Sequence, residues 1–438
     1  MHFSLVFSLQ IIKFIRHLEG HRPIPQLTLH LHLMDSLTHI VLGAAIGEVV
    51  LGKKIGNRAL IWGAIGETIP DLDVLGNFFM DPTAALAFHR GITHSILFAV
   101  IAPLVFGGLV YKLYHSERHK GWPYKILISI INLALIASLI FLFNYLFSVN
   151  HHPRWWLLTL TIGLGAYLGW RLYMYYLKKD LESPQTSFGK WYLLFFLTFI
   201  THILLDSCTT FGTQLFQPFS NYRVAFNNIA VADPAYTIPF LICTVIFCFL
   251  RRGSRPRAIF TWLGIGISSA YMIFTIINKF HVDSVFEKAL AHRQMEVTRW
   301  RTSPTILNNL LWTCVAEDPK QYYVGQYSIF DSDPNLHYIN VIPKNDSLHQ
   351  VYSALPDYKT LRWFSDGYLA IYQSDTITVL SDLRYGGMSD TLKDYHDMVF
   401  NFKVDHGKDG VTFSEYRQPL PGNFWEVLGR LILRMEGY

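Results

Sequence analysis

The sequence is poor in charged residues and in cysteine. Only 16% of its 438 residues are Asp, Glu, Lys or Arg, whereas soluble domains contain about 25%. Hydrophobic residues make up 51%, which excludes an intrinsically disordered chain and leaves too little polar surface for a wholly soluble protein. The four cysteines, Cys208, Cys243, Cys248 and Cys314, have no regular spacing, so neither a disulfide framework nor a four-cysteine zinc site is expected. A bound metal would have to be held by histidine and carboxylate.

The hydrophobic residues gather in runs long enough to cross a bilayer. The clear runs are 94–111, 125–148, 155–177, 191–208, 235–250 and 258–280. Two shorter runs, 36–51 and 59–69, precede them and fit short spans or half-helices. In the first of these, Gly43 and Gly47 form a small-xxx-small pair that favours close helix packing, although a chance pair is an equal alternative. We expect a polytopic α-helical membrane protein with about six to eight transmembrane or half-membrane helices.

The basic residues predict how these helices are oriented. Fifteen Lys and Arg residues lie in one alternating set of connecting loops and only three in the other. The positive-inside rule places the first set in the cytoplasm, so the loops 70–93, 148–154 and 209–234 should face outward. The net charge of +5 is therefore a sign of membrane topology, and no nucleic-acid partner is expected. The predicted location is the bacterial cytoplasmic (inner) membrane, with the lipid bilayer as a partner.

Residues 1–33 fit this pattern poorly. Met34 is followed by Asp35 and Ser36, a helix N-cap signal directly before an apolar run. We interpret Met34 as the start of the protein, and residues 1–33 as an upstream extension or a disordered segment. A signal peptide is the alternative, but a small-residue cleavage site is absent. The membrane-embedded domain is then 34–280.

Beyond residue 280 the hydrophobic runs stop. Residues 281–303 predict an amphipathic connecting helix, and a last helix is expected at 424–435. Between them, alternating patterns predict strands at 322–330, 337–342, 360–365, 368–373 and 376–380. We expect 281–438 to form a soluble, extracytoplasmic α+β domain with an antiparallel sheet. It lacks a His/Asp cluster, which favours a lid or a module for an unknown protein partner.

Polar residues that interrupt the apolar half gather in five short motifs. They are Thr38-His39, Pro70-Asp-Leu-Asp73, His89-Arg-Gly-Ile-Thr-His-Ser95, His202-Ile-Leu-Leu-Asp206 and Thr209-Thr-Phe-Gly-Thr213. In extended backbone, residues two apart face one side, so Asp71 and Asp73 could approach one ion. In a helix, residues four apart share a face, so His202 and Asp206 could bind together. The loop charges place all five motifs at the outer membrane face. That assignment used only Lys and Arg, so it did not depend on the His and Asp residues of the motifs.

This convergence predicts a metal site. The expected ligands are the imidazoles and carboxylates of these motifs: His39, Asp71, His89, His94, His202 and Asp206. Asp73 is either a further ligand or the partner that fixes a histidine tautomer. Mixed imidazole and carboxylate ligands suit Zn²⁺ best, with Mn²⁺ or Fe²⁺ as alternatives. Each residue alone is weak evidence, because a lone histidine at a helix end is more often simply solvated.

Further residues are candidates for catalysis beside the metal. Arg90 could hold a phosphate or stabilise transition-state charge, since its planar guanidinium matches phosphate oxygens. Thr93, Thr209 and Thr210 could position the substrate or the ligands. Glu67 lies in an apolar stretch, where a carboxylate is a functional suspect, although it could simply pair with Arg58.

The motif set, read together, resembles the YdjM family of bacterial inner-membrane proteins. The resemblance covers Met34 to about Phe280 and rests on Asp35-Ser-Leu-Thr-His39, the paired aspartates after Pro70, the motif from His89 to Ser95, and His202 to Thr213. It implies a membrane location and metal-dependent hydrolase chemistry, without a settled substrate.

The expected function is water activation by a His/Asp metal site at the outer face. An ester or phosphoester of a lipid-linked molecule is the expected substrate. Two alternatives stay open. An ion- or proton-coupled transporter would need ionisable residues near the bilayer midplane and internal repeats. A non-catalytic membrane scaffold would use the metal structurally.

Overall fold

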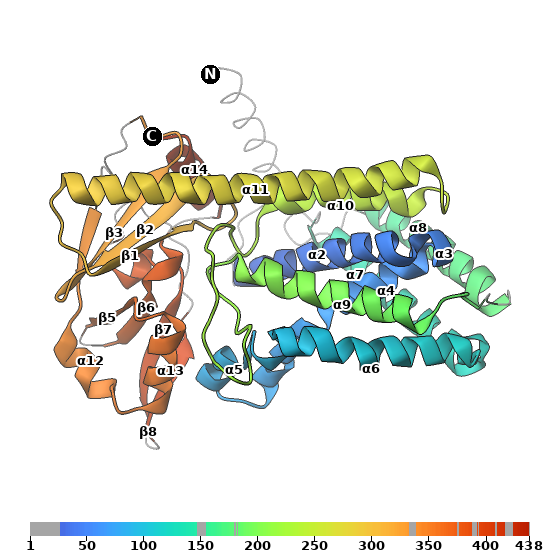
Figure 1. Ribbon diagram of the computed structural model, residues 1–438, viewed down its shortest axis with the longest axis horizontal. Helices are drawn as coiled ribbons and strands as arrows, with labels where there is room; N and C mark the ends of the chain where they lie inside the picture. Colours follow the sequence, from blue (N-terminus) through green and yellow to red (C-terminus); the bar gives the residue numbers. More distant parts are fainter. Residues whose placement is uncertain are drawn as a thin grey trace. The chain divides into compact units, whose positions relative to one another are not determined.

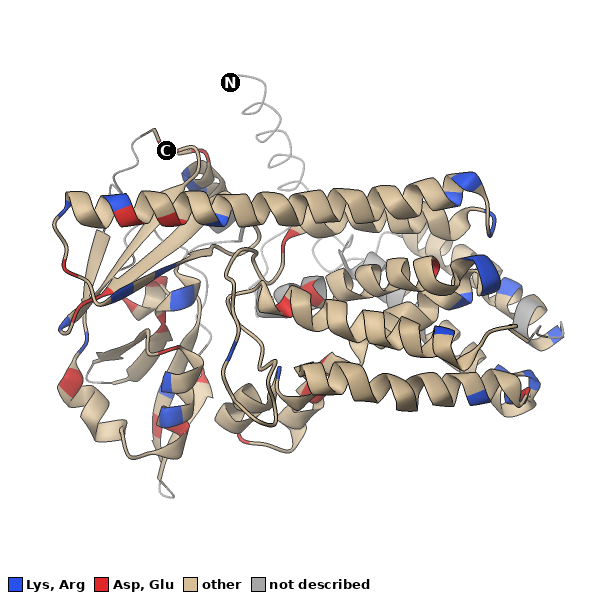
Figure 2. Cartoon of the chain, viewed as in Figure 1, with Lys and Arg blue, Asp and Glu red and all other residues tan. Residues whose placement is uncertain are grey.

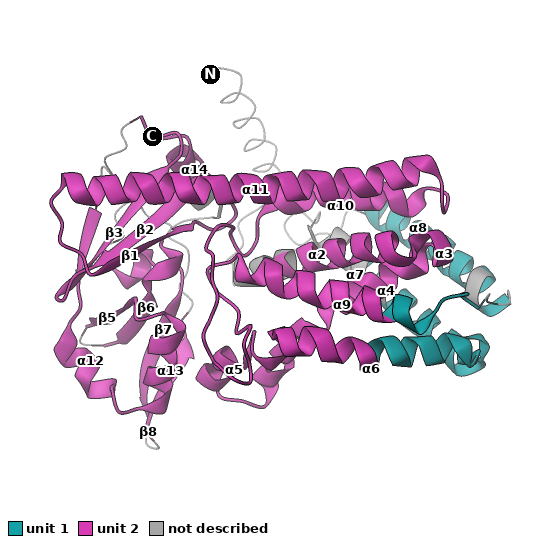
Figure 3. Ribbon diagram, viewed as in Figure 1, with its two compact units in different colours: residues 1–24, 106–191, 420–429 teal, residues 25–105, 192–419, 430–438 magenta. Residues whose placement is uncertain are grey.

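The structure is a computed structural model of the whole chain, drawn in Figure 1. The residues that it describes are 27–146, 155–178, 181, 183–332, 339–374, 376–387, 392, 394–407, 410–416 and 424–437. The chain forms two compact units (Figure 3), of which one contains residues 106–191 and the other contains 25–105 and 192–419. Most of the segment 1–33, and with it the predicted extension, lies outside the described residues.

The N-terminal two thirds of the chain are helical, as predicted. The helices are α2 (Leu27–Gly47), α3 (Lys53–Ile55), α4 (Asn57–Thr68), α5 (Pro82–Phe88), α6 (Ile96–His115), α7 (Trp122–Leu146), α8 (Trp155–Leu172), α9 (Phe188–Ser207), α10 (Pro234–Phe249) and α11 (Arg255–His292). Within the described residues, four segments are long and apolar enough to cross a membrane: Asp35–Ile55, Ile96–His115, Phe188–Ser207 and Arg255–His292. The helical membrane part is thus confirmed, while the count of six to eight helices in the membrane stays a prediction.

Helices α2 and α4 pack with their backbones in contact. A Cβ atom added to Gly43 would lie 2.3 Å from the carbonyl oxygen of Gly63, and one added to Gly47 would lie 2.0 Å from that of Ala59. Only glycine permits such an approach, so the close packing predicted from the glycine pair is confirmed. This contact holds the helix that carries His39 against α4.

The start of the first helix differs from the prediction. Helix α2 begins at Leu27, because residues 27–34 contain neither proline nor glycine to stop it. Asp35 is therefore inside the helix, where its side chain pairs with Arg90 at 3.2 Å instead of capping the helix.

The C-terminal part contains two four-stranded antiparallel sheets. The first has the order β1 (Arg299–Pro304), β2 (Leu311–Glu317), β3 (Gln321–Ser328) and β4 (Ile339–Pro343). The second has the order β5 (Leu369–Gln373), β6 (Thr378–Asp382), β7 (Asn401–Gly407) and β8 (Gly410–Glu415). The helices are α12 (Asp346–Tyr352), α13 (Pro356–Phe364) and α14 (Phe424–Met435). The expected antiparallel α+β domain is present, with two sheets in place of one.

Two predicted elements in this part were wrong, and the strands β2, β7 and β8 were not predicted. Helix α11 continues without a break to His292, and residues 299–304 form β1 instead of the end of a connecting helix. The predicted strand 360–365 belongs to α13, where Tyr358, Leu361 and Phe364 are buried along one helical face. Strand β2 was missed because all seven of its residues are buried, so it lacks the alternation of a half-exposed strand.

Helix α11 connects the membrane part to the first sheet. Its last turns bury Val282, Phe286 and Ala289 against Trp312 and Cys314 of β2. The same helix starts at its other end beside basic residues, which Figure 2 shows at the tips of α3 and α11, away from the sheets. One helix therefore extends from the basic end of this unit to the β-sheets.

Candidate metal centre

Four separate segments bring the polar motifs together. Helix α9 supplies His202 and Asp206 one turn apart, near its C-terminal end. A 3₁₀ helix, η2 (Pro70–Phe78), carries Asp71 in its first turn. A second one, η3 (Ile92–His94), ends at His94, and α2 supplies His39. The paired aspartates were expected in extended backbone; they lie in a 3₁₀ turn instead, and they reach opposite ring nitrogens of His94, Asp71 at Nε2 and Asp73 at Nδ1.

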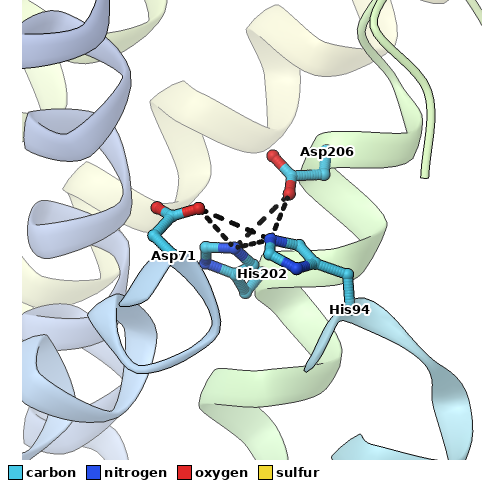
Figure 4. A group of neighbouring side chains, drawn as sticks. All are labelled: Asp71, His94, His202 and Asp206. Atoms are coloured by element: carbon cyan, nitrogen blue, oxygen red, sulfur yellow. Dashed lines mark hydrogen bonds and ion pairs between the residues drawn. The ribbon is translucent and has the colours of Figure 1, made fainter. Parts of the chain in front are cut away.

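Four donor atoms converge in the middle of this cluster (Figure 4). Nε2 of His94 lies 3.0 Å from Nε2 of His202. Oδ1 of Asp71 lies 3.4 and 3.5 Å from these two nitrogens, and Oδ2 of Asp206 lies 3.2 and 3.4 Å from them. Ligands at the zinc–nitrogen distance of about 2.0–2.1 Å on a tetrahedron are about 3.3 Å apart. The five separations therefore match a site that could hold a metal ion.

Asp73 supports this group from behind His94. Its Oδ2 lies 3.2 Å from Nδ1 of His94, on the opposite side of the ring from the converging Nε2. The same oxygen accepts hydrogen bonds from the Thr93 hydroxyl and the Arg90 backbone N–H. Oδ1 lies 2.8 Å from Nδ1 of His89. A carboxylate in this position fixes the histidine tautomer that leaves Nε2 as a metal ligand.

His39 forms a second, adjoining group. Its Nε2 lies 3.3 Å from Oδ1 of Asp206 and 3.8 Å from Asp35, and its Nδ1 lies 3.5 Å from Oε1 of Glu67. The His39 ring also packs on the His202 ring, with centroids 3.9 Å apart. Neither His39 nitrogen has a hydrogen-bond partner of good geometry, although both are buried. His39 therefore shares Asp206 with the central four atoms without being one of them.

Arg90 is enclosed by the cluster. Its Nη2 lies 3.0 Å from Oδ1 of Asp206 and 3.2 Å from Asp35, and Nη1 donates to the Thr209 hydroxyl at 2.8 Å. The residue is only 2% exposed. The guanidinium thus holds the Asp206 oxygen that faces away from the two central histidines, and its expected contact with a phosphate stays a prediction.

Of the two threonines that follow α9, Thr209 lies beside this arginine. Thr209 donates its hydroxyl to the Asp206 carbonyl, which ends the helix, and accepts from Arg90. The Thr210 carbonyl lies 3.5 Å from Nη1 of Arg384 in the C-terminal part. Both threonines are buried, and Thr209 alone contacts the arginine, so their expected contact with a substrate stays a prediction.

The cluster is rich in negative charge. Within the described residues, its ion pairs join five carboxylates, and its one guanidinium is that of Arg90; the carboxylates are Asp35, Glu67, Asp71, Asp73 and Asp206. Buried charges of one sign are costly unless cations balance them. Burial alone would raise the pKa of Asp73, but its hydrogen bonds with His89 and His94 hold that pKa well below its usual range. Burial would also raise the pKa of Asp71, but the nearby charge of His202 outweighs this effect and lowers the pKa of Asp71. The site thus keeps Asp71 and Asp73 ionised, and it requires positive charge to balance them.

An apolar surface lies beside the cluster. The 3₁₀ helix η2, which carries Asp71, exposes Leu72, Val74 and Leu75; Phe78 at its end and Phe79 just after it are 78% and 88% exposed. A soluble protein seldom exposes so many large apolar side chains together. Asp71 is the most open of the four central ligands, with a side chain 20% exposed against 0–1% for the others. The accessible side of the site therefore adjoins a surface suited to lipid.

The structure thus brings together most of the predicted site. Asp71, His94, His202 and Asp206 meet at one point, with His39 and Asp73 in direct contact with them. His89 is not one of the converging ligands; it pairs with Asp73, and its ring packs edge-on against that of His94, with centroids 5.9 Å apart. The sequence predicted Asp35 as a helix cap and not as a metal ligand. It singled out Glu67 as a possible functional residue, because a carboxylate in an apolar segment is unusual.

The apolar helices and the His/Asp groups that could hold a metal ion indicate a membrane protein with a candidate metal site. Residues 34–282, more than half of the sequence, match the family model described as YdjM inner membrane protein. The chain belongs to this family.

Two relatives are similar to part of the chain. The uncharacterized protein YfhP of Bacillus subtilis is 22% identical over 290 residues, 62% of this chain and 65% of YfhP. The inner membrane protein YbcI of Escherichia coli is 29% identical over 102 residues, 23% of this chain and 58% of YbcI. The chain therefore spans less than two thirds of either relative. No solved structure matches it.

Proposed function

We propose that the chain is a membrane-embedded, metal-dependent hydrolase. The observation that carries the proposal is the convergence of four donor atoms, from Asp71, His94, His202 and Asp206, at tetrahedral separations in a buried, carboxylate-rich cluster. Two imidazoles and two carboxylates suit Zn²⁺, with Mn²⁺ or Fe²⁺ as alternatives. When bound, such an ion activates water for attack on an ester or phosphoester.

The protein's own residues supply the geometry for this reaction. Asp73 holds His94 in the tautomer that points Nε2 inward, and Arg90 holds one oxygen of Asp206 so that the other faces the histidines. Asp71 lies on the open side, where substrate and water have access. The exposed apolar residues of η2 adjoin that side, which supports a lipid or lipid-linked molecule as the substrate.

The loop charges support an orientation with the metal centre outward. Basic residues lie at the ends of α3 and α11 that are distant from the sheets (Figure 2), and the positive-inside rule assigns such ends to the cytoplasm. The C-terminal part would then be periplasmic, in a multi-pass protein of the bacterial inner membrane.

A structural metal in a non-catalytic scaffold is the second candidate. Four protein ligands complete a tetrahedron, and closed sites of this kind are typical of structural zinc. The open position of Asp71 favours catalysis, because this ligand could yield a position to water. A transporter is less well supported, since Asp206 is the penultimate residue of α9 and not at its middle.

Purified protein in lipid nanodiscs tests these candidates. We expect about one equivalent of metal per chain and hydrolysis of a phosphoester or carboxyl ester lipid from a screened panel. Chelation should stop the reaction and zinc should restore it. Metal-loaded protein that cleaves nothing, and that loses thermal stability on chelation, would instead support the structural site.

A further inference from the structure

A second polar site lies where the loop after α9 meets the C-terminal domain. The structure has a cavity of about 480 Å³ there, within the range of about 300–1,000 Å³ typical of ligand sites. Four arginines line it, Arg223 from the loop, Arg299 and Arg301 from β1, and Arg384 from η6 (Leu383–Tyr385). We call it the arginine cavity. We propose that the arginine cavity binds the phosphate group of a phosphorylated ligand.

Three of the four arginines have a carboxylate partner. Arg384 forms a bidentate pair with Asp382, at 2.9 and 2.6 Å. Arg299 pairs with Glu317, and Arg301 lies 3.4 Å from Asp366. These pairs fix the positions of three guanidinium groups in the cavity wall.

Arg223 is different. In the part of the chain that the structure describes, no carboxylate lies within 4.0 Å of its guanidinium. Its Nε and Nη2 donate to the backbone carbonyl of Phe211, whereas Nη1 is buried and has no hydrogen-bond partner. A buried donor without an acceptor is costly, and an anion in the cavity would supply the acceptor.

Aromatic rings hold Arg223 near the other cations. Its guanidinium carbon lies 4.6 Å from the ring centroids of both Phe211 and Phe364, and that of Arg384 lies 4.9 Å from Phe364. Such contacts contribute about 0.5–2 kcal/mol each, but they do not neutralise the charge. Burial and the nearby Arg384 lower the pKa of Arg223 to about 9, which agrees with a cluster short of negative charge.

Phosphate fits this arrangement better than a single carboxylate. Guanidinium groups bind phosphate oxygens through two parallel N–H donors, and several of them can share one phosphate. The cavity is also much larger than a phosphate ion, and Trp363 and Tyr368 contribute aromatic walls. The ligand is therefore an organic phosphate whose attached group packs on these rings.

The arginine cavity adjoins the metal centre without being part of it. The Phe211 ring, which lines the cavity, also lies 4.9 Å from the guanidinium carbon of Arg90 and 5.2 Å from the His89 ring. A ligand in the cavity would be one aromatic side chain away from the predicted hydrolase site. Binding itself does not require that site to be catalytic.

Calorimetric titration of the full-length protein tests the proposal. The soluble probe is glycerol 3-phosphate, added to protein in neutral detergent. The lipid probe is phosphatidic acid, added to phosphatidylcholine nanodiscs that carry the protein. We expect saturable binding of at least one probe, weakened at least ten-fold by Arg223→Gln and by Arg301→Gln. Arg362→Gln is the matched control, because this exposed arginine lies outside the arginine cavity.

The possible outcomes distinguish a soluble phosphate from a lipid headgroup, and they test the arginine cavity separately from the proposed hydrolase function. Binding of the soluble probe indicates a free organic phosphate, and binding of the lipid alone indicates a headgroup. Absence of binding to both, binding unaffected by Arg223→Gln in folded protein, or equal binding of citrate would overturn the proposal. Phosphate binding in a protein without metal or hydrolysis would refute the proposed function and leave the arginine cavity standing.

Discussion

Asp206 directs its two carboxylate oxygens to different partners. Oδ2 lies 3.2 Å from Nε2 of His94, and Oδ1 lies 3.0 Å from Nη2 of Arg90. A second divalent cation at the adjoining group of Asp35, His39 and Asp206 would compete with the buried guanidinium, which already pairs with both carboxylates. The arrangement therefore favours one metal ion, with Arg90 as the fixed positive charge next to it.

Substitution Asp206→Asn should remove the metal. The amide lacks the negative charge that both the ion and Arg90 require, so we expect the metal Kd to rise more than 100-fold, beyond the roughly 10–100-fold effect of outer-shell changes. Metal content after gel filtration and chelator competition measure this. Asp81→Asn, at an exposed helix start, is the control. Unchanged metal content in folded Asp206→Asn protein would refute the assignment of Asp206 as a ligand.

Substitution Asp73→Asn should have a smaller effect on the same measurement. Asp73 contacts Nδ1 of His94 and not the converging nitrogen, so its loss relaxes the tautomer and leaves the ligands in place. The expected increase in metal Kd is about 10–100-fold. Thr93→Val, which removes one hydrogen bond to Asp73, should weaken binding less. A complete loss of metal in Asp73→Asn would make Asp73 a ligand itself.

The pair of Glu48 and Arg257 should be important for stability. Glu48 is a carboxylate in an apolar run, and it accepts two hydrogen bonds from Arg257, at 2.8 and 2.6 Å. Breaking a buried pair costs about 3–5 kcal/mol, because the other charge stays buried. Thermal unfolding in detergent should show this loss for Glu48→Gln, and replacement of both residues by Met should restore part of it. Glu117→Gln, in an exposed pair, should leave the midpoint unchanged.

The glycine contact between α2 and α4 predicts a packing defect. In Gly63→Ala the new methyl would lie 2.0 Å from the carbonyl oxygen of Gly43, so the helices must separate. We expect a cost of about 1–3 kcal/mol, typical of overpacking, and weaker metal binding because α2 carries His39. Gly163→Ala, where no atom lies within 4 Å of the added Cβ, is the control. Equal midpoints for both variants would contradict the close contact.

Acid should destabilise the C-terminal domain through His349. Burial, with a further contribution from Arg362, lowers the pKa of His349 from 6.5 to about 4. The folded domain then binds fewer protons than the unfolded chain, so this stabilisation is complete above pH 6.5 and is lost as the pH falls toward 4. The thermal midpoint should fall over this window, less steeply in His349→Gln. His396→Gln, at an exposed histidine, should follow the wild type.

The site was more predictable than the C-terminal fold. His202 and Asp206 share a helix face by their spacing alone, and loop charges placed the remaining motifs at the same end. The sequence could not show that Asp35 faces Arg90, since the same Asp-Ser pair is an ordinary helix cap. It also could not show that Arg90 would be enclosed, because that depends on contacts between four distant segments.

Strand prediction failed at β2, where burial removed the alternating pattern, and it also missed β7 and β8, although Val404 and Phe413 are buried between more exposed neighbours there. Strand β2 is buried along its whole length, so its sequence has no polar face from which a strand could be recognised. In α13 the aromatic and β-branched residues from Thr360 to Phe364 resemble a strand, but Pro356 starts a helix and the core lies along one side of it.

Helix α11 is much longer than a single membrane span. At about 1.5 Å per residue, its 38 residues extend about 57 Å, whereas the hydrocarbon layer is about 30 Å thick. Adding or deleting a single residue between the bilayer and β1 would turn the sheets by about 100° around the helix axis. Asn278 of this helix is hydrogen-bonded to Asn309, which in turn donates to the carbonyl of Asn228 in the loop after α9. The number of residues in α11 therefore sets the rotational alignment between the sheets and that loop, and length changes there should be less tolerated than in the surface turns.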